Sequence, residues 1–223
     1  MLKAKSLYHL IVYSILFIIV LISSFTFIII NNTHDELQEK IYTLKTDYTN
    51  NQKELIKNHV NYIINFIDYY NETFKDKKSQ AEIQKEILQT IEKLRVNQNP
   101  NEYIFIYDFN GKLIQDAVSK NNIGENFYNL KDINGKEVIK ELITTSQKKH
   151  GGYVEYVWYK PEISKQTNKI SYSLSYNKWN WTIGKGVYLD EIDKLVKIKE
   201  EEFNQKISNY TLQITSLTIM LIL

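Results

Sequence analysis

A run of 24 residues without Asp, Glu, Lys or Arg, from Leu7 to Ile30, constrains this chain more than any other feature of its sequence. At about 1.5 Å per residue, a helix of this run is roughly 36 Å long, which is enough to cross a hydrocarbon core of about 30 Å. A cleaved signal peptide has a shorter apolar region and a small-residue cleavage site, whereas here bulky residues lead directly into Asn31. The run therefore predicts an uncleaved membrane anchor.

The charges beside this run predict its orientation. Lys3 and Lys5 precede the run, and Asp35 and Glu36 follow it. The positively charged flank of a membrane helix stays in the cytoplasm. We therefore expect residues 1–6 in the cytoplasm, residues 7–30 in the cytoplasmic (inner) membrane, and the chain from residue 31 onwards in the periplasm or outside the cell.

The C-terminal end of the chain is apolar as well. No charge follows Lys206, and the last 17 residues end on the most apolar stretch of the tail. Because a membrane span needs about 20 residues, this tail fits either a buried C-terminal helix or a second membrane helix that is cut off. We favour the second interpretation, with residues 191–210 as a juxtamembrane signalling helix and residues 211–223 as the start of the second span. In this interpretation the chain is the N-terminal part of a longer receptor.

Composition excludes several classes of function. Two of the 28 Lys and Arg residues are Lys3 and Lys5, so the remaining 26 (28 − 2) balance the 26 Asp and Glu residues. A neutral domain argues against nucleic-acid binding, which needs a basic face. The chain has no cysteine, and its four histidines lack the spacing of metal ligands. No nucleophile motif or phosphate-binding loop occurs, so we expect neither an enzyme nor a bound metal or cofactor.

Residues 31–98 are predicted to form two helices. Thr33–Asn97 contains neither Gly nor Pro, and its apolar residues advance in steps that sum to seven. This pattern predicts one long helix from about His34 to Phe74. Its membrane-proximal part is expected to pair two chains into a homodimer. The alternative is a lone amphipathic helix that covers a sheet, and this interpretation holds for the later half in any case. The repeating positions are Leu37, Ile41, Leu44, Tyr48, Leu55, Tyr62, Phe66 and Tyr69, and the first four are the expected seam.

A capping box marks the start of the second helix. Ser79 is followed three residues later by Glu82, so each side chain can bind the other residue's backbone amide. The apolar residues that follow are expected on one face, and the helix should end before Pro100. They are Ile83, Ile87, Ile91 and Leu94.

The composition of residues 99–190 is typical of a β-sheet. Five β-branched and aromatic runs cover residues 103–107, 112–118, 152–159, 169–176 and 179–188. Asn-Gly at 110–111 predicts a tight hairpin with positive φ angles, and a second Asn-Gly at 134–135 precedes a short helix. Since no crossover helix separates the last three runs, neighbouring strands should be antiparallel. The predicted fold class is α+β, an antiparallel sheet on a long N-terminal helix. A last helix from Asp190 should bury Ile192, Leu195, Phe203 and Ile207.

Five segments in a fixed order carry a resemblance to a known family. The segments are YIFIYDFNGKLI (103–114), IGENFYNLKDINGKEVIKELI (123–143), GGYVEYVWYKP (151–161), KISYSLSY (169–176) and WNWTIGKGVYLDEID (179–193). In these segments the chain resembles the single Cache domain of bacterial sensors, of the second common type. This resemblance implies a PAS-like sheet outside the membrane that binds a small molecule, often a small organic acid, and signals inward. The implied outputs are chemotaxis, histidine-kinase or diguanylate-cyclase modules, none of which lies in these residues. The alternative is a membrane-anchored binding or adhesion module without signalling output.

The resemblance also implies a binding pocket for this ligand. Lys169 matches a lysine that the family often has, and the implied aromatic wall is Tyr103, Phe105, Tyr156, Trp158 and Tyr172. One departure is notable, because Asp116 stands where the family commonly has the histidine of an Ala-His-Pro sequence. We expect Lys169 and Asp116 to be the charged pair of the pocket, with Tyr172 and Leu174 packing inward beside Lys169. Two opposite charges in the pocket suit an amino acid as ligand. If Lys169 and Asp116 only neutralise each other, the pocket suits a neutral polar ligand. The remaining alternative is that Lys169 and Asp116 are solvated surface residues.

Overall fold

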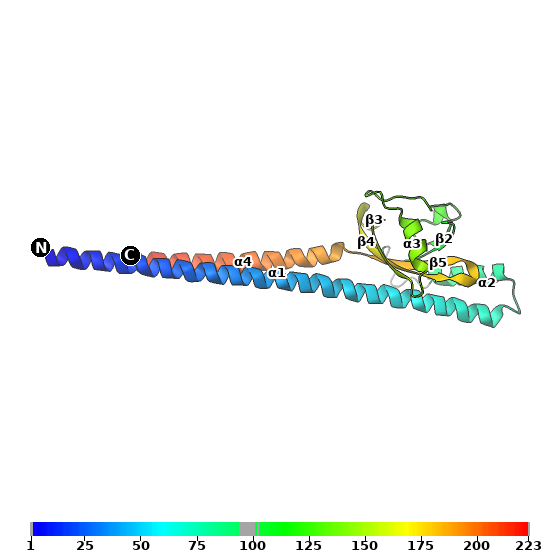
Figure 1. The fold of residues 1–223 in the computed structure, drawn as a ribbon, viewed down its shortest axis with the longest axis horizontal. Coiled ribbons are helices and arrows are strands. Elements are labelled where there is room, and N and C mark those ends of the chain that lie inside the picture. Colours follow the sequence, from blue (N-terminus) through cyan, green and yellow to red (C-terminus); the bar gives the residue numbers. More distant parts are fainter. Residues whose placement is uncertain (1, 94–100, 102, 223) are drawn as a thin grey trace. The chain divides into compact units, whose positions relative to one another are not determined.

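The computed structural model of the chain describes residues 2–93, 101 and 103–222 (Figure 1). These residues fall into two compact units, Tyr48–Glu191 and a second unit from Met1–Asp47 and Ile192–Leu223. The first unit contains most of α1 (Leu2–Phe74) beyond its apolar run, together with α2 (Gln80–Lys93), α3 (Val138–Ser146) and the sheet. The second unit contains the apolar part of α1 and nearly all of α4 (Asp190–Ile222). We refer to the first as the sensor unit.

The sheet is antiparallel throughout, as the sequence predicts. Its strand order is β2-β1-β5-β4-β3. The strands are β1 (Ile104–Asp108), β2 (Leu113–Asp116), β3 (Gly152–Lys160), β4 (Lys165–Tyr176) and β5 (Trp181–Tyr188). Two short 3-10 helices, η2 (Lys120–Asn122) and η3 (Asn177–Trp179), lie in the connections. The structure therefore starts β4 earlier than expected, and places Trp179 in η3 rather than in the last strand.

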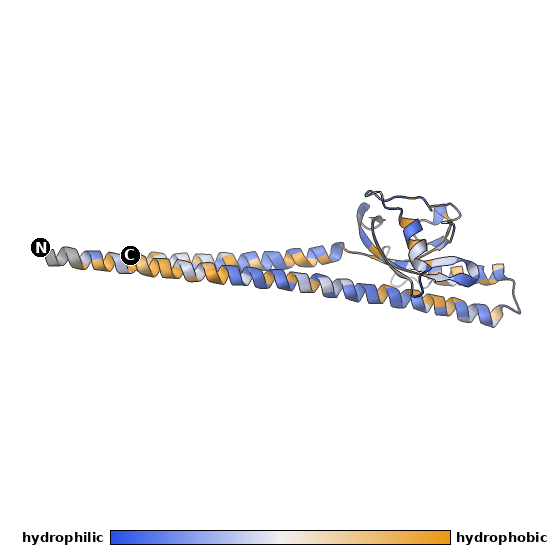
Figure 2. Cartoon of the chain, viewed as in Figure 1, coloured by the Kyte–Doolittle hydropathy of each residue, from blue (hydrophilic) through white to orange (hydrophobic). Residues whose placement is uncertain are grey.

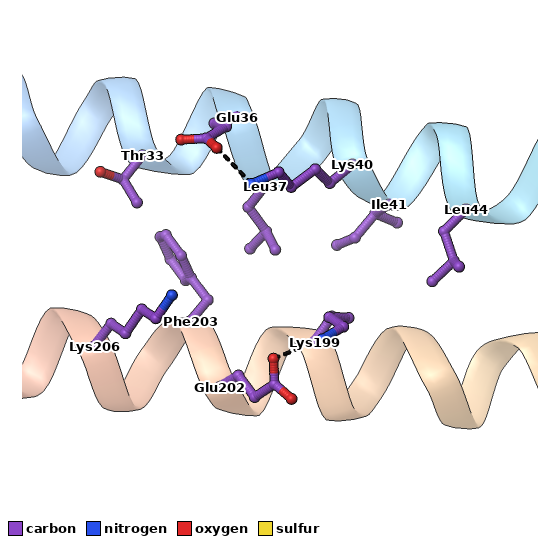
Figure 3. Close-up of a pocket in the computed structure, with 10 residues that line it drawn as sticks. All are labelled: Thr33, Glu36, Leu37, Lys40, Ile41, Leu44, Lys199, Glu202, Phe203 and Lys206. Atoms are coloured by element: carbon purple, nitrogen blue, oxygen red, sulfur yellow. Dashed lines mark hydrogen bonds and ion pairs between the residues drawn. The ribbon is translucent and has the colours of Figure 1, made fainter.

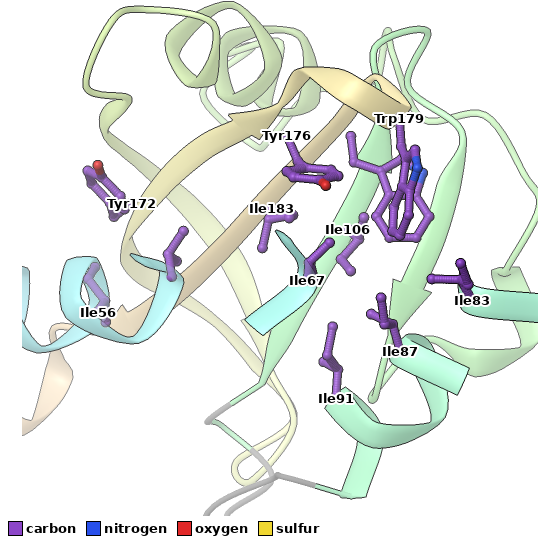
Figure 4. Packing of buried hydrophobic residues seen from close by; sticks show 12 residues of the cluster. Ile56, Ile67, Ile83, Ile87, Ile91, Ile106, Tyr172, Tyr176, Trp179 and Ile183 are labelled. Carbon is purple, nitrogen blue, oxygen red and sulfur yellow. The ribbon is translucent and has the colours of Figure 1, made fainter. Parts of the chain in front are cut away.

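Helices cover both faces of this sheet in the sensor unit. On one face, α1 and α2 pack with apolar side chains of β1, β4 and β5, as Figure 4 shows. On the other face, α3 lies over β3, β4 and β5, and its apolar side chains form one core with those of β1, β2 and β3. Alternation along β1 explains the division, because Ile106 faces α1 and α2 whereas Phe105 and Tyr107 face α3. Each face therefore has its own apolar core.

The capping box of α2 is confirmed. The Oγ of Ser79 accepts a hydrogen bond from the Glu82 amide at 3.3 Å, and the Glu82 carboxylate accepts one from the Ser79 amide at 2.9 Å. Ile83, Ile87 and Ile91 are all buried against the sheet. Leu94, the fourth residue expected on this face, and the end of the helix before Pro100 lie outside the described residues.

Two turns of the same sequence, Asp-x-Asn-Gly-Lys, connect elements on the α3 side. In each turn the aspartate side chain accepts hydrogen bonds from the amides two and four residues later, as Asp108 does at 2.9 and 2.8 Å and Asp132 at 2.9 and 3.0 Å. Of the two residues in each Asn-Gly pair, only the glycine has a positive φ, +87° at Gly111 and +83° at Gly135. The first turn is thus a three-residue hairpin loop held by an aspartate rather than a two-residue turn.

Two details of the predicted helices are wrong. In the sensor unit the residues of α1 under the sheet are Ile56, Val60 and Ile67, whereas Leu55, Tyr62 and Tyr69 are exposed. In α4, Leu195 is 43% exposed and the neighbouring Val196 is buried instead. The reason is the same in both helices: two adjacent rows of apolar residues follow the helix, and the contact with the rest of the fold selects one of them.

The apolar run of the sequence lies within α1. Among the described residues, α1 is long and apolar enough to cross a membrane, with a mean hydropathy of 2.6 in its most apolar window. Figure 2 shows that hydrophobic residues concentrate in the N-terminal part of α1. Side chains of the run, such as Leu10 and Phe17, are largely exposed in the single chain. This exposure suits a lipid environment.

Candidate functional site

Lys169 is the most deeply buried charged side chain of the sheet, together with Lys160. Lys169 lies on β4 between Tyr156 of β3 and Tyr188 of β5, and only 1% of its surface is exposed to solvent. Its Nζ donates a hydrogen bond to the Oη of Tyr103 at 2.8 Å, and lies 4.2 Å from the ring centre of Tyr103 and 4.8 Å from that of Tyr188. Two aromatic rings therefore provide much of the environment of this ammonium group.

A glycine on the neighbouring strand makes room for this lysine. A Cβ atom at Gly186 would lie 2.4 Å from the Cε of Lys169 and 2.2 Å from the Oγ of Ser171. Gly184 does the same for Phe105, whose ring would lie 2.3 Å from such an atom. Both glycines therefore accommodate side chains of the site.

Burial strongly affects the ionisation of Lys169. Loss of hydration lowers the pKa of Lys169 to about 7, and the negative charge of Asp116 opposes part of this shift. Burial, reinforced by the charge of Asp116, also raises the pKa values of Tyr103, Tyr107 and Tyr156, so that these phenols stay neutral. The site therefore holds one anion, one lysine that can lose its proton near neutral pH, and neutral hydrogen-bonding hydroxyls.

Asp116 ends β2 and lies opposite Phe105 of β1. It is 4% exposed, and its Oδ1 accepts hydrogen bonds from the amides of Val118 at 2.7 Å and Ser119 at 3.0 Å. These two bonds fix the position of the carboxylate. The structure thus rules out the alternative that Lys169 and Asp116 are solvated surface residues.

An aromatic wall and α3 complete the site. The rings of Tyr156 and Trp158 meet edge to face with centres 5.5 Å apart, and the Oη of Tyr156 hydrogen-bonds to the Oγ of Ser171 at 2.7 Å. The cavity has a volume of about 10 Å³, which is about the space of one water probe, so a larger ligand must displace side chains. Its lining residues are Tyr103, Phe105, Tyr107, Asp116, Ile139, Leu142, Tyr156, Trp158 and Lys169.

Six of the seven predicted site residues meet at this cavity, and Tyr172 does not. Tyr172 packs in the core on the α1 side of the sheet, and its Oη donates to the carbonyl of His150 at 2.6 Å. The reason is strand alternation, since residues 169 and 172 of one strand must point to opposite faces. Leu174 likewise packs on the α1 side. Sequence reasoning did not select Tyr107, Ile139 and Leu142, although Tyr107 shares the face of Tyr103 and Phe105.

A second buried lysine connects the sheet to the start of α4. The Nζ of Lys160 binds both carboxylate oxygens of Asp190, at 2.9 and 2.8 Å. The side chain of Lys160 is 2% exposed and that of Asp190 is 20% exposed. Lys160 also lies 5.6 Å from the ring centre of Tyr188, the same ring that faces Lys169. Tyr188 is therefore shared by the pocket lysine and by the ion pair at the first residue of α4.

The second unit, formed by residues 1–47 and 192–223, contains an open groove between α1 and α4 with a volume of about 370 Å³. Figure 3 shows Leu37, Ile41 and Leu44 of α1 pointing toward α4, and Phe203 of α4 pointing back toward them. Three of the four residues that the sequence predicts for pairing between chains thus already face a helix of their own chain.

Comparisons with known proteins agree with this fold. The family model named single Cache domain 2 matches residues 48–202. A sensor histidine kinase of Rhizobium johnstonii, MctS, is 40% identical over 90 residues, which are 40% of this chain and 19% of that protein. The methyl-accepting chemotaxis protein McpP of Pseudomonas putida is 29% identical over 114 residues, 51% of this chain and 21% of that protein. The chain thus matches about a fifth of the length of each.

Solved structures of other proteins have a similar fold. A methyl-accepting chemotaxis protein from Vibrio parahaemolyticus superposes with a TM-score of 0.60 and 27% identity, over 69% of this chain and 99% of that one. A Cache chemosensory domain described for its carboxylic acid recognition superposes with a TM-score of 0.55 and 25% identity, over 67% of this chain and 97% of that one. Both similarities extend over nearly the whole of the other chain.

Proposed function

The chain belongs to the single Cache domain 2 family, and from that membership we propose that it senses a small organic acid or amino acid outside the cytoplasmic membrane. One observation carries the proposal: Lys169, fully buried, faces an aromatic cavity that also holds Asp116. A buried ammonium group is costly to maintain, and a ligand carboxylate would compensate that cost.

The ligand carboxylate would bind Lys169 from the side of Tyr156 and Trp158. The lysine carries three N–H donors, and its hydrogen bond in the described part of the chain goes to the Tyr103 hydroxyl. The phenol of Tyr107 and the rings of the wall would surround the rest of a small ligand. The similar domain with carboxylic acid recognition supports this class of ligand.

Asp116 favours an amino acid over a simple acid. A simple carboxylate would bring a second negative charge into a cavity where Asp116 is already buried, and like charges in such a site repel strongly. The ammonium group of an amino acid would instead lie toward Asp116 while its carboxylate binds Lys169. The ligand would then add no net charge to the cavity.

The signal would leave the sensor unit through β5. Tyr188 lies beside Lys169 and ends this strand, and Asp190, bound to Lys160, begins α4 two residues later. A ligand that moves Lys169 would change the packing of Tyr188, and thereby bias α4 between two arrangements. We propose that an output module of the chemotaxis or histidine-kinase type receives this change, in a receptor anchored with its N-terminus in the cytoplasm.

A thermal-shift screen tests the proposal. The purified full chain in detergent is heated with acetate, propionate, glycine or alanine, and a ligand that binds the folded state raises the melting temperature. We expect a dose-dependent rise with at least one probe, and a larger rise with an amino acid than with the acid of matched size. No rise with any of the four would contradict the proposed ligand classes.

A further inference from the structure

The sensor unit contains another cavity, which lies beside the ion pair of Lys160 and Asp190. Its volume is about 110 Å³, which is room for several water molecules, whereas the cavity at Lys169 has room for about one. A small solute therefore fits here without displacing side chains. The lining comes from α1, the sheet and α4, and it includes Tyr48, Gln52, Lys160, Tyr188 and Glu191.

This cavity has a buried inner part and an entrance. Lys160 is 1% exposed and Tyr188 is 5% exposed, whereas Tyr48 and Gln52 are half-buried. Glu191, at the second position of α4, is exposed. A solute can thus enter beside the Glu191 carboxylate and reach side chains that are shielded from water.

The charges around the cavity disfavour an anion. The Nζ of Lys160 binds both oxygens of Asp190, at 2.9 and 2.8 Å, and lies 3.6 Å from the Glu162 carboxylate. With Glu191, three carboxylates therefore lie around the one ammonium group in the described lining. Burial, together with the charges of Glu191 and Asp190, raises the pKa of Tyr48 to about 12, so this phenol stays neutral. An anion would meet a lysine that is already neutralised and an excess of negative charge.

The hydrogen-bonding groups suit an ammonium ion instead. The Oη of Tyr48 donates to the Oε2 of Glu191 at 3.1 Å, and a carboxylate can accept further hydrogen bonds at its other lone pairs. The phenol oxygen of Tyr48 and the amide oxygen of Gln52 are neutral acceptors in the same lining. A primary ammonium group has three N–H donors and no acceptor, which matches one carboxylate and two neutral oxygens.

We propose that this cavity binds a small primary amine in its ammonium form, with Glu191 as the counter-ion and with Tyr48 and Gln52 as further acceptors. The site is separate from the cavity at Lys169 and assumes nothing about the ligand there. Tyr188 lines the proposed site, and its ring centre lies 4.8 Å from the Nζ of Lys169. A bound amine would therefore contact the connection from β5 to α4, through which we propose that the signal leaves the sensor unit.

A thermal-shift titration of the full chain in detergent with methylammonium chloride tests the proposal. Potassium chloride at the same ionic strength is the matched salt. We expect a saturable rise in melting temperature that exceeds the rise in potassium chloride. Glu191→Gln should weaken methylammonium binding at least about tenfold, because it removes the charge that binds the ammonium group. Glu200→Gln, which removes an exposed carboxylate of the same helix, should bind like wild type.

Asp116→Asn separates this site from the cavity at Lys169, and it should leave the methylammonium shift unchanged. Loss of the shift in Asp116→Asn would place the amine at Asp116 and overturn the second site. Equal rises in both salts, or no rise in either, would also overturn it, as would equal weakening by Glu191→Gln and Glu200→Gln. None of these results decides the proposed sensor function, which acetate, propionate, glycine and alanine test.

Discussion

The Nζ of Lys169 lies 2.8 Å from the Oη of Tyr103 and 4.2 Å from the centre of that tyrosine's ring. One phenol thus contributes both a hydrogen-bond acceptor and a π face to the same buried ammonium group. This arrangement supports a cation in a nearly dry cavity that Asp116 also lines.

The stability of the folded chain should rise with pH just above neutrality. Folding lowers the pKa of Lys169 from 10.5 to about 7, so between these values the unfolded chain binds a proton that the folded chain does not. Raising the pH through this window therefore favours the folded state, by at most about 1.4 kcal/mol per pH unit from this group. Thermal unfolding from about pH 7.5 to about pH 9 measures the effect. Lys169→Met should flatten the profile, and an unchanged profile would mean that Lys169 does not titrate there.

Asp116→Asn and Asp116→His should change which ligands bind. Either side chain can still accept a hydrogen bond from the amides of Val118 and Ser119, but neither brings the negative charge. We expect the ratio of thermal shifts to move from glycine toward acetate, more strongly with histidine, because a simple carboxylate no longer meets a buried anion. Identical ratios in wild type and both variants would show that Asp116 does not set specificity.

Gly186→Ala should disturb the site through sterics alone. The added methyl group would lie 2.4 Å from the Cε of Lys169, so the lysine must leave its position between the two tyrosine rings. Overpacking of this kind costs about 1–3 kcal/mol of stability, and it should also abolish the ligand-induced thermal shift. Val187→Ala, at the next position of β5 and on the other face, should keep the shift. Retention of full binding by Gly186→Ala would contradict the placement of Lys169.

Removing one partner of the Lys160–Asp190 pair should be strongly destabilising. Asp190→Ala removes the bidentate carboxylate of Lys160 and leaves its buried ammonium only the more distant Glu162 carboxylate, at 3.6 Å, so we expect a loss of up to about 3–5 kcal/mol. The double variant Asp190→Ala with Lys160→Met should recover much of this loss, because it removes the poorly compensated buried charge. Chemical denaturation of the full chain in detergent measures both. A single variant as stable as wild type would show that the pair is not needed to hold the start of α4.

Orientation in the membrane is tested separately. A reporter that functions only in the cytoplasm, fused after Asp47, should be silent if, as we propose, the charges of Lys3 and Lys5 keep the N-terminus in the cytoplasm. The same reporter fused before Leu7 provides the positive control. Activity of the fusion after Asp47 would reverse the assigned topology and place the sensor unit in the cytoplasm.

Local sequence patterns predicted the elements well where the interaction is itself local. The Ser79–Glu82 capping box and the turns at Gly111 and Gly135 are made by residues within four positions of one another, so the sequence contains all the partners. The antiparallel sheet also follows from the spacing of the strands. These features needed no knowledge of distant contacts.

The wrong predictions concern which residues are buried, and contacts between residues far apart in the sequence determine this. In α1, the rows through Leu55 and through Ile56 are both apolar, and only packing against the sheet selects Ile56. The burial of Lys169 depends on the missing side chain of Gly186 on another strand, which no local pattern reveals. Tyr172 is different: the alternation of β4 already places it opposite Lys169, and it was assigned to the pocket through the resemblance to the family.

Isothermal titration of the full chain with the best probe of the screen tests the central claim most directly, namely that Lys169 binds the ligand in the aromatic cavity. Wild type is compared with Lys169→Met and with Lys165→Met, which removes an exposed lysine at the start of the same strand. We predict that Lys165→Met binds like wild type and that Lys169→Met loses binding while its circular dichroism spectrum shows a folded chain. Undiminished binding by a folded Lys169→Met variant would contradict the assignment of this cavity as the ligand site.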